Sequence, residues 1–368
     1  MGRPVVITGG GTGGHVYPMR AIADALLESG VTREELRFVG SRRGQERTLL
    51  AGEIPLTLLP GRGVRRSLTP KDLLANLGAL WGLGRAVMRA QILVRQWRPS
   101  VVVSVGGYAS FGVALAAVVW RVPLVLVDFD AVPGAAHRLL GRFATTRCSA
   151  FSSSGARVVE TGAPIRRALE DLDRSADARR VAKASQAPPI DPERTVVLVM
   201  TGSLGSHRVN VAVRQLAQHW SARDDLSLVH VTGRRDYDEF SRPLSLAALD
   251  YRVIDFGDME VLWSLCDVAV CRAGAITVAE LEILAIPSVL IPLPGAPHDH
   301  QTKNARALAD AGGAVVLSDA NCTGEVLASD LEVLLASATR EEMSRALRSL
   351  ARPHAAAAIA RVVLEARR

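Results

Sequence analysis

Aromatic side chains are scarce in this 368-residue chain, where Phe, Trp and Tyr together make up 4%. None of them interleaves with the basic runs. Single-stranded nucleic acids are bound in basic grooves whose aromatic side chains stack on the bases, so the composition argues against a nucleic-acid partner. Cysteine is scarce as well, and its positions lack the paired spacing of a metal site. We expect four buried free thiols at Cys148, Cys266, Cys271 and Cys322.

Long hydrophobic runs are also missing. The apolar run at residues 111–120 ends at Arg121 and Pro123, short of the roughly 20 residues that a membrane-spanning helix needs. The chain enters a strand pattern almost at once and has no signal-peptide layout, so we expect a protein of the cytosol. With 48% hydrophobic and 22% charged residues it is globular. Its length predicts two domains of roughly 150–200 residues.

Apolar strand patterns alternate with helical patterns through both halves of the chain. The alternation predicts an α/β protein whose parallel sheets are covered by helices. A polar stretch at residues 174–192 is interpreted as a connection. If two doubly wound domains face each other, their ligand lies in the cleft between the carboxyl ends of the strands. Strands are expected at 5–8, 36–40, 56–59, 101–105, 124–127, 196–200, 228–232, 251–256, 268–271, 288–291 and 314–317.

Glycine-rich turns follow three of these strands, at residues 9–14, 106–107 and 202–205. A strand that ends in glycines and opens a helix presents backbone N–H groups and the positive end of a helix dipole, which suits phosphate. The first turn also matches the Gly-x-Gly-x-x-Gly dinucleotide fingerprint, and Arg42 and Arg43 could receive a 2′-phosphate. An NADP-linked oxidoreductase therefore stays open, as does a purely structural role for each turn.

Two further features of the sequence suit an enzyme that transfers a chemical group. His15 follows the first glycine turn directly, where a base could reach an acceptor hydroxyl, although a structural histidine is the alternative. In the second half, a glycine turn enters a helix that carries Glu280, and Gln301 follows nearby. A glutamate can accept both hydroxyls of a ribose, and an amide can bridge sugar hydroxyls. The alternative for Glu280 is a solvated helix residue.

Positive charge is concentrated in the first half. Residues 1–160 contain 20 Lys and Arg against 10 Asp and Glu, whereas residues 161–368 contain 24 against 27. Many of these cations lie in residues 62–98, among apolar residues at spacings of three and four. Such a helix could lie on an anionic membrane surface or hold an anionic lipid. A core-facing helix with a solvated basic face is the alternative.

Taken in order and spacing, six motifs resemble those of the MurG family, glycosyltransferase family 28. This is the family of UDP-N-acetylglucosamine:undecaprenyl-pyrophosphoryl-MurNAc-pentapeptide N-acetylglucosaminyltransferases. The resemblance implies two Rossmann-like domains facing across a cleft (GT-B), with an acceptor- and membrane-facing domain at 1–163 and a UDP-sugar-binding domain at 164–350. A C-terminal helix in 351–368 would return to the first domain. The motifs lie at residues 8–18, 106–108, 161–166, 202–205, 271–280 and 300–305.

The resemblance further implies an inverting transfer of GlcNAc from UDP-GlcNAc to the MurNAc 4-hydroxyl of lipid I, giving lipid II for peptidoglycan synthesis. The partners would be UDP-GlcNAc, the polyprenyl-diphosphate-linked acceptor and the anionic inner membrane surface. The protein would sit peripherally on the cytoplasmic face of the cell membrane, and no cofactor or metal is implied.

The implied catalytic residue is His15, as base, with Asp130 as the second candidate. The implied contacts with the acceptor and the transferred sugar are Thr12, Gly13 and Gly14, and those with the lipid diphosphate are Gly106, Gly107 and Tyr108. The implied donor contacts are Asp130, Arg166, Ser203, Gly257, Ala275, Ile276, Thr277, Val278, Ala279, Glu280, His300 and Gln301.

The chain departs from the family pattern in three places: Leu204 replaces a glutamine, Ala163 replaces an asparagine, and residues 127–130 differ as a segment. Where the family has His-Glu-Gln-Asn, this chain has Val-Asp-Phe-Asp at residues 127–130, so Asp130 replaces an asparagine that touches the donor sugar. An anion there is unfavourable beside the donor diphosphate unless it is protonated or paired. Asp128 and Asp130 also mimic a metal-binding Asp-x-Asp, but two residues apart on a strand they point to opposite faces. A same-fold glycosyltransferase for a secondary metabolite or another lipid, and a non-catalytic sugar-nucleotide binder, therefore stay open.

Overall fold

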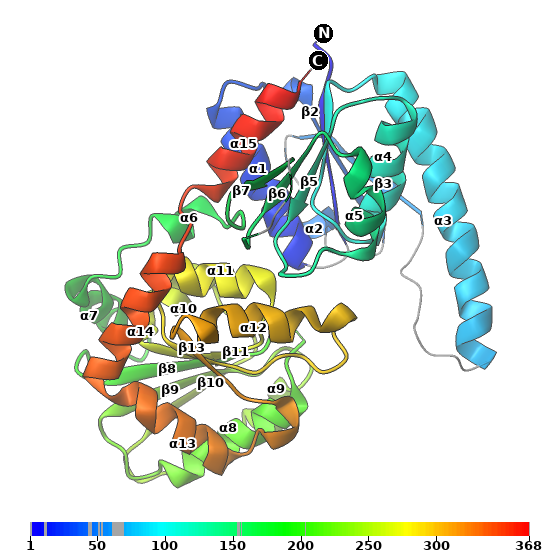
Figure 1. Ribbon diagram of the computed structural model, residues 1–368. Coiled ribbons are helices and arrows are strands. Elements are labelled where there is room, and N and C mark those ends of the chain that lie inside the picture. Colours follow the sequence, from blue (N-terminus) through cyan, green and yellow to red (C-terminus); the bar gives the residue numbers. More distant parts are fainter. Residues whose placement is uncertain are drawn as a thin grey trace. The chain divides into compact units, whose positions relative to one another are not determined.

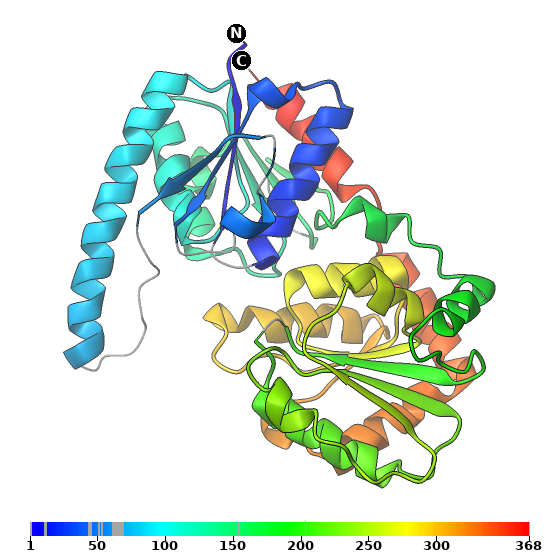
Figure 2. The same ribbon diagram turned by 180° about the vertical axis from the view of Figure 1, so that it is seen from behind.

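The computed structural model describes residues 2–10, 13–42, 46–50, 52, 54–60, 70–152, 155, 157–202 and 204–367. For residues 13, 49 and 70–80 it describes the backbone alone. The chain divides into two compact units, one formed by Met1–Arg167 with Pro353–Arg368 and the other by Ala168–Arg352 (Figure 1 and Figure 2). The expected boundaries, after residues 163 and 350, lie close to these divisions.

The described part of the first unit contains one parallel sheet in the order β3-β2-β1-β4-β5-β6-β7. Strand β1 lies between β2 and β4, and its last residue, Thr8, is in register with Ser104 of β4. The chain changes direction across the sheet between these two strands, which is where open parallel sheets bind ligands. The strands are β1 Val5–Thr8, β2 Leu36–Ser41, β3 Leu56–Leu59, β4 Val101–Ser104, β5 Leu124–Asp128, β6 Thr146–Ser149 and β7 Val158–Glu160.

Helices cover both faces of this sheet. Figure 1 shows α1 and α15 on one face and α3, α4 and α5 on the other. On the second face, Ala86, Ala90 and Val94 of α3 are buried at four-residue spacing, so one stripe of this helix faces the core. The helices are α1 Gly13–Glu28, α2 Glu46–Leu49, α3 Pro70–Trp97, α4 Tyr108–Val119, α5 Ala135–Leu140 and α15 Ala355–Ala366, with short helices at Arg33–Glu35 and Gly141–Phe143. Helix α6, Arg167–Glu170, begins at the last residue of this unit and continues into the second.

The second unit repeats this architecture. Its parallel sheet has the order β10-β9-β8-β11-β12-β13 in the described residues. The strands are β8 Thr195–Met200, β9 Leu226–Val231, β10 Asp250–Ile254, β11 Val268–Cys271, β12 Ser288–Leu290 and β13 Ala314–Val316. The helices are α7 Ala176–Ala184, α8 His207–His219, α9 Tyr237–Phe240, α10 Met259–Leu265, α11 Ala275–Leu284, α12 His300–Asp310, α13 Gly324–Leu335 and α14 Ser337–Leu350, with short helices at Pro297–Asp299 and Asp319–Asn321.

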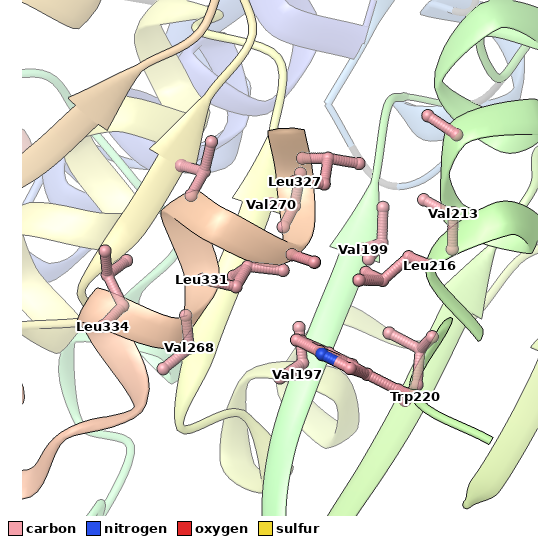
Figure 3. Close-up of a cluster of buried hydrophobic side chains, with 14 of the residues drawn as sticks. Val197, Val199, Val213, Leu216, Trp220, Val268, Val270, Leu327, Leu331 and Leu334 are labelled. Atoms are coloured by element: carbon pink, nitrogen blue, oxygen red, sulfur yellow. The ribbon is translucent and has the colours of Figure 1, made fainter. Parts of the chain in front are cut away.

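The core of the second unit lies between its central strands and two helices (Figure 3). Val197 and Val199 of β8 pack with Leu216 of α8, and Leu331 of α13 joins the same cluster. Burying each Val or Leu side chain contributes roughly 1.5–3 kcal/mol. This packing fixes the central strands β8 and β11, whose carboxyl ends lead to Gly202 and to the start of α11.

The predicted strands are confirmed, with ends that differ by at most two residues. The interpretation of residues 174–192 as a connection is wrong, because this stretch contains α7. The Ser175 hydroxyl caps this helix by accepting from the Ala178 N–H at 3.2 Å, and the buried Lys183 ammonium pairs with Asp267 at 2.9 Å. A helix held by charged contacts lacks the apolar stripe on which sequence recognition depends.

Two other expectations from composition can be compared with the structure. All four cysteines are free and buried, as predicted, and burial raises the pKa of Cys148 and of Cys266 to about 12. No helix in the described part of the chain is both long enough and apolar enough to cross a bilayer.

Candidate functional site

In the first unit, three loops meet at the carboxyl edge of the sheet. His15 lies in the first turn of α1, after β1, and its ring is edge-on to Phe129, which follows β5, with ring centroids 5.5 Å apart. A Cβ atom on Gly106, after β4, would lie 3.6 Å from Nε2 of His15. The structure therefore brings the predicted base beside the predicted Gly106–Gly107 turn. It also brings this base beside residues 127–130, the segment that differs from the family pattern and ends in Asp130.

The two glycine turns of this unit touch through their backbones. Gly107 has φ +81°, and a Cβ atom there would lie 2.3 Å from the carbonyl oxygen of Gly10. Such a distance excludes any side chain at position 107. Helix α4 begins directly after Gly107, and α1 begins at Gly13, so two helix N-termini open at this edge. The N–H groups and the dipole at the N-terminus of a helix suit an anion.

Two expected acceptor residues need separate comment. The Tyr108 hydroxyl forms a hydrogen bond with the Ser41 hydroxyl, and the backbone N–H of Ser41 donates to the Glu46 carboxylate at 2.8 Å. Tyr108 is thus held beside the end of β2. Thr12 lies outside the described residues, only the backbone of Gly13 is described, and Gly14 is exposed.

A buried network of charged and polar side chains packs next to these loops at the carboxyl edge of the sheet. The sequence did not predict this network. The Nδ1 atom of His137 lies 2.7 Å from the Asp128 carboxylate, and its Nε2 atom lies 2.8 Å from the Ser104 hydroxyl. Arg147 donates to the other Asp128 oxygen at 2.9 Å. Asp128 and His137 are 5% and 3% exposed. Burial raises the pKa of Asp128, but His137 and Arg147 together outweigh it and lower that pKa overall, so the carboxylate stays ionised.

Arg166 and Asp130 complete the expected residues of this unit. The Arg166 guanidinium lies over the Tyr17 ring, 5.0 Å from its centroid, and is therefore held against α1. Asp130 follows β5 and is half-buried.

In the second unit, the predicted diphosphate turn becomes the N-terminus of α11. This helix begins at Ala275, directly after Gly274, and the six residues from Ala275 to Glu280 form its first six positions. Glu280 is 7% exposed, and its Oε2 atom accepts a hydrogen bond from the Trp263 indole at 3.0 Å. The alternative of a solvated helix residue is therefore wrong for Glu280. Its carboxylate is buried and oriented, as recognition of a hydroxyl pair would require.

Two further side chains tie the loops around this turn together. The Arg272 guanidinium donates to the Ser206 hydroxyl and pairs with Asp319, each at 2.7 Å. The buried Asn304 amide donates to the Ala273 carbonyl at 3.1 Å. Both residues stand inside the motifs that carry the resemblance, but their positioning role depends on contacts between separate loops. Spacing along the chain gives no signal for such contacts.

His300 and Gln301 are the first two residues of α12. The Gln301 side-chain oxygen accepts from the Leu293 N–H at 2.9 Å, which leaves its NH₂ group as the donor for a ligand. His300 Nδ1 lies 2.8 Å from the Pro297 carbonyl oxygen. The preceding residues, His298 and Asp299, both have φ +54°, a region that non-glycine residues adopt at a cost. Strained backbone of this kind is concentrated at ligand sites.

The expected base-binding and phosphate-binding turns follow the carboxyl ends of β10 and β8, which lie on either side of β9. A Cβ atom on Gly257 would lie 2.8 Å from a Leu262 methyl group, so this position is tightly packed. The neighbouring Phe256 ring is exposed, with the Arg234 guanidinium 4.9 Å from its centroid. Ser203 lies outside the described residues. Its neighbour Gly205 has φ +75° and lies against the Thr232 carbonyl.

Comparison with known proteins assigns both halves of the chain to one class. Residues 5–148 match the glycosyltransferase family 28 N-terminal domain, and residues 196–359 match the family 28 C-terminal domain. Among solved structures, the chain is similar to Acinetobacter baumannii MurG, with 27% identity and a TM-score of 0.77 over 99% of this chain and 100% of that one. It also shares its fold with the calicheamicin glycosyltransferase CalG4, at 16% identity and a TM-score of 0.69 over 99% of each chain. These matches define a glycosyltransferase with two Rossmann-like domains.

Curated relatives narrow the class. The chain is 37% identical to the "UDP-N-acetylglucosamine--N-acetylmuramyl-(pentapeptide) pyrophosphoryl-undecaprenol N-acetylglucosamine transferase" of Anaeromyxobacter dehalogenans strain 2CP-C, over 98% of this chain and 92% of the relative. It is 38% identical to the protein of the same name from Alkalilimnicola ehrlichii, over 99% of both chains. The chain belongs to the MurG family. This membership disfavours the NADP-linked oxidoreductase.

Proposed function

We propose that the protein transfers N-acetylglucosamine from UDP-N-acetylglucosamine to the MurNAc 4-hydroxyl of a polyprenyl-diphosphate-linked acceptor, lipid I, giving lipid II. Membership of the MurG family over nearly the whole chain carries this proposal. The chemistry is an inverting hexosyl transfer. The acceptor oxygen forms a bond to the anomeric carbon, the bond from that carbon to the diphosphate breaks, and UDP leaves with the bonding electrons.

His15 is the proposed base. Its ring lies beside Gly106 and Phe129, where an acceptor hydroxyl bound over the glycine turns would meet it. It would take the proton of the 4-hydroxyl as the new bond forms. The acceptor diphosphate would lie on the N–H groups of the Gly106–Gly107 turn and at the N-termini of α1 and α4, with Thr12, Gly13, Gly14 and Tyr108 around it.

Most of the proposed donor contacts belong to the second unit. The N-terminus of α11, from Ala275 to Val278, would receive the leaving diphosphate and stabilise the charge that develops on it. Glu280 would accept the ribose hydroxyls, and the backbone of Gly257 would contact uracil. Gln301 and His300 would hold the hydroxyls of the transferred sugar. The remaining proposed donor contacts are Asp130, Arg166, Ser203 and Ala279.

We also propose that α3 docks the first unit on the anionic cytoplasmic surface of the cell membrane. Trp81 is 73% exposed on this helix, and Met88 and Ile92 are exposed too. A cavity of about 470 Å³ is lined by Met88 and Ile92 together with Arg85 and Arg89. A helix that buries one stripe yet exposes large apolar side chains beside cations has the composition of a membrane-surface helix. Residues 61–69 of the basic segment lie outside the described residues.

Incubation with UDP-GlcNAc and synthetic lipid I, followed by measurement of UDP and disaccharide lipid, tests the activity. We expect both products in equal amounts. Turnover with a secondary-metabolite or other lipid acceptor, but not with lipid I, would assign the chain to another acceptor. Saturable UDP-GlcNAc binding without UDP release would identify a non-catalytic binder, and either result would overturn the proposal.

A further inference from the structure

A cavity of about 650 Å³ lies in the second unit, away from the proposed donor site. Its wall includes Asp267 and Pro287, which directly precede β11 and β12. It therefore opens at the amino ends of these strands, whereas the donor turn follows the carboxyl end of β11. Helix α14, the C-terminal end of α11 and residues from Glu170 to Arg179 form the rest of the wall. The volume is within the range of sites that hold small molecules.

Arginine dominates the lining of this cavity. Five arginines and three carboxylates face it, so the lining is net positive. One of the carboxylates, Asp267, is already neutralised by Arg179 at 3.2 Å and by Lys183 at 2.9 Å. Arg345 and Arg348 lie one turn apart on α14, and neither forms a side-chain hydrogen bond or ion pair with the described residues. The five arginines are Arg174, Arg179, Arg340, Arg345 and Arg348.

We propose that this cavity binds a small, soluble phosphorylated molecule carrying at least two negative charges. Guanidinium groups bind phosphate oxygens in a bidentate manner, and two of them on one helix face match a doubly charged group. The volume admits a sugar phosphate or a nucleotide. This binding goes beyond the proposed transferase activity and does not require it.

The contacts of Arg174 connect the cavity to the donor site. Its guanidinium donates to the main-chain oxygen of Trp263 and, at 2.6 Å, to that of Cys266 at the end of α10. The indole of the same Trp263 donates to Glu280. A ligand that binds the Arg174 guanidinium therefore competes with its hydrogen bond to Trp263. Trp263 in turn holds the Glu280 carboxylate, which is proposed to bind the ribose. This coupling rests on the proposed function, and it makes the cavity a regulatory site for donor binding.

Calorimetric titration of the full chain with inorganic diphosphate tests the site. UDP is present at saturation so that the donor site is filled. We expect saturable binding that becomes at least tenfold weaker in the double variant Arg345→Ser, Arg348→Ser. The control is Arg242→Ser, Arg306→Ser, which removes the same charge from exposed positions of the same unit outside the cavity. Absence of binding, or an equal loss in the control, would overturn the site.

A second probe separates a soluble ligand from a lipid headgroup. UMP should displace diphosphate from the UDP-saturated protein, whereas phosphatidylglycerol vesicles should not. Displacement by the vesicles alone would overturn the assignment to a soluble ligand. Because these titrations need no turnover, they succeed or fail independently of the transferase activity, and a lack of UDP binding in the same calorimeter would instead count against the proposed function.

The coupling has its own test in the affinity for UDP. Diphosphate competes with UDP at the donor site in the parent and in the double variant alike, whereas the effect transmitted from the cavity exists in the parent alone. We expect the apparent Kd for UDP to depend on diphosphate differently in the two proteins. Identical dependence would overturn the regulatory role.

Discussion

The indole nitrogen of Trp263 donates a hydrogen bond to the Glu280 carboxylate at 3.0 Å, and this contact joins α10 to α11. Both side chains are buried. The carboxylate is therefore presented in a fixed orientation instead of rotating freely on the helix surface. A site that orients its acceptor in advance loses less entropy when the ligand binds.

Replacing Glu280 tests its proposed role in donor binding. Glu280→Ala should raise the KM for UDP-GlcNAc by a factor equivalent to about 1.5–3 kcal/mol, because a hydrogen bond to a charged group is lost. Trp263→Phe keeps the carboxylate but removes its orienting donor, so a smaller rise is expected. Steady-state kinetics with varied UDP-GlcNAc measure both. An unchanged KM in Glu280→Ala would exclude this residue from the ribose site.

The second prediction concerns the base. His15→Ala should lower kcat by roughly 10²–10⁴, the usual contribution of a general base, while the Kd for UDP stays the same. His219→Ala, at the exposed C-terminal end of α8, is the control and should leave kcat unchanged. A decrease of less than about threefold in His15→Ala would show that the ring of His15 is structural.

The sequence predicts the parts of the site that glycine marks. A glycine turn between a strand and a helix has a local signature, so the amino-acid pattern alone locates His15, the Gly106–Gly107 turn and the start of α11. Glu280 can be placed on its helix for the same reason. Its burial could not be predicted, because that depends on Trp263 from another helix.

The buried network of the first unit shows why the rest was missed. Ser104 is separated from Asp128 and His137 by the whole of α4, and it meets them because β4 and β5 are neighbours in the sheet. The periodicity of apolar residues along the chain does not indicate which strands pair in the sheet. Helix α7 was missed for a related reason, since Lys183 contacts Asp267 across more than eighty residues of sequence. Contacts between polar groups on separate elements are set by topology.

The third prediction tests that network. Asp128→Asn removes the carboxylate that lies between His137 and Arg147. It should lower the free energy of unfolding by about 3 kcal/mol, because breaking a buried ion pair leaves the Arg147 guanidinium uncompensated. Asp24→Asn is the control, because Asp24 pairs with Arg20 on the exposed face of α1. A change within about 0.5 kcal/mol is expected there. Urea denaturation at pH 7.5 compares the two, and equal losses would contradict a special role for Asp128.

The fourth prediction concerns acid stability. His230 is buried between Asn210 and Tyr251, and burial, with a further contribution from the charge of Arg214, lowers its pKa from 6.5 to about 3. The unfolded chain therefore binds a proton near pH 6.5 that the folded chain does not bind until pH 3. Stability from this group is present above pH 6.5 and is lost as the pH falls toward 3.

The size of this loss can be measured. Between pH 6.5 and 4.5 it should reach roughly 2.5 kcal/mol, at 1.36 kcal/mol per pH unit for one proton. Urea denaturation at these two pH values should show that loss in the parent and a correspondingly smaller one in His230→Gln, which has no titrating ring. The exposed His219→Gln should behave like the parent. Equal pH dependence in parent and His230→Gln would assign the acid sensitivity to other groups.

The last prediction tests the proposed docking of α3 on the membrane. Arg85 and Arg89 lie in the same cavity wall as the exposed side chains of Met88 and Ile92. A cation near an anionic bilayer contributes about 1 kcal/mol, and the effect fades beyond a Debye length of roughly 10 Å at 0.1 M salt. Arg85→Ser with Arg89→Ser should therefore weaken co-sedimentation with phosphatidylglycerol vesicles by about 2 kcal/mol, and raised salt should weaken the parent in the same way. Arg242→Ser with Arg306→Ser removes the same charge from the second unit and should have little effect. Equal binding by the α3 variant and the parent at low salt would contradict membrane docking. It would support the alternative, in which α3 is a core-facing helix with a solvated basic face.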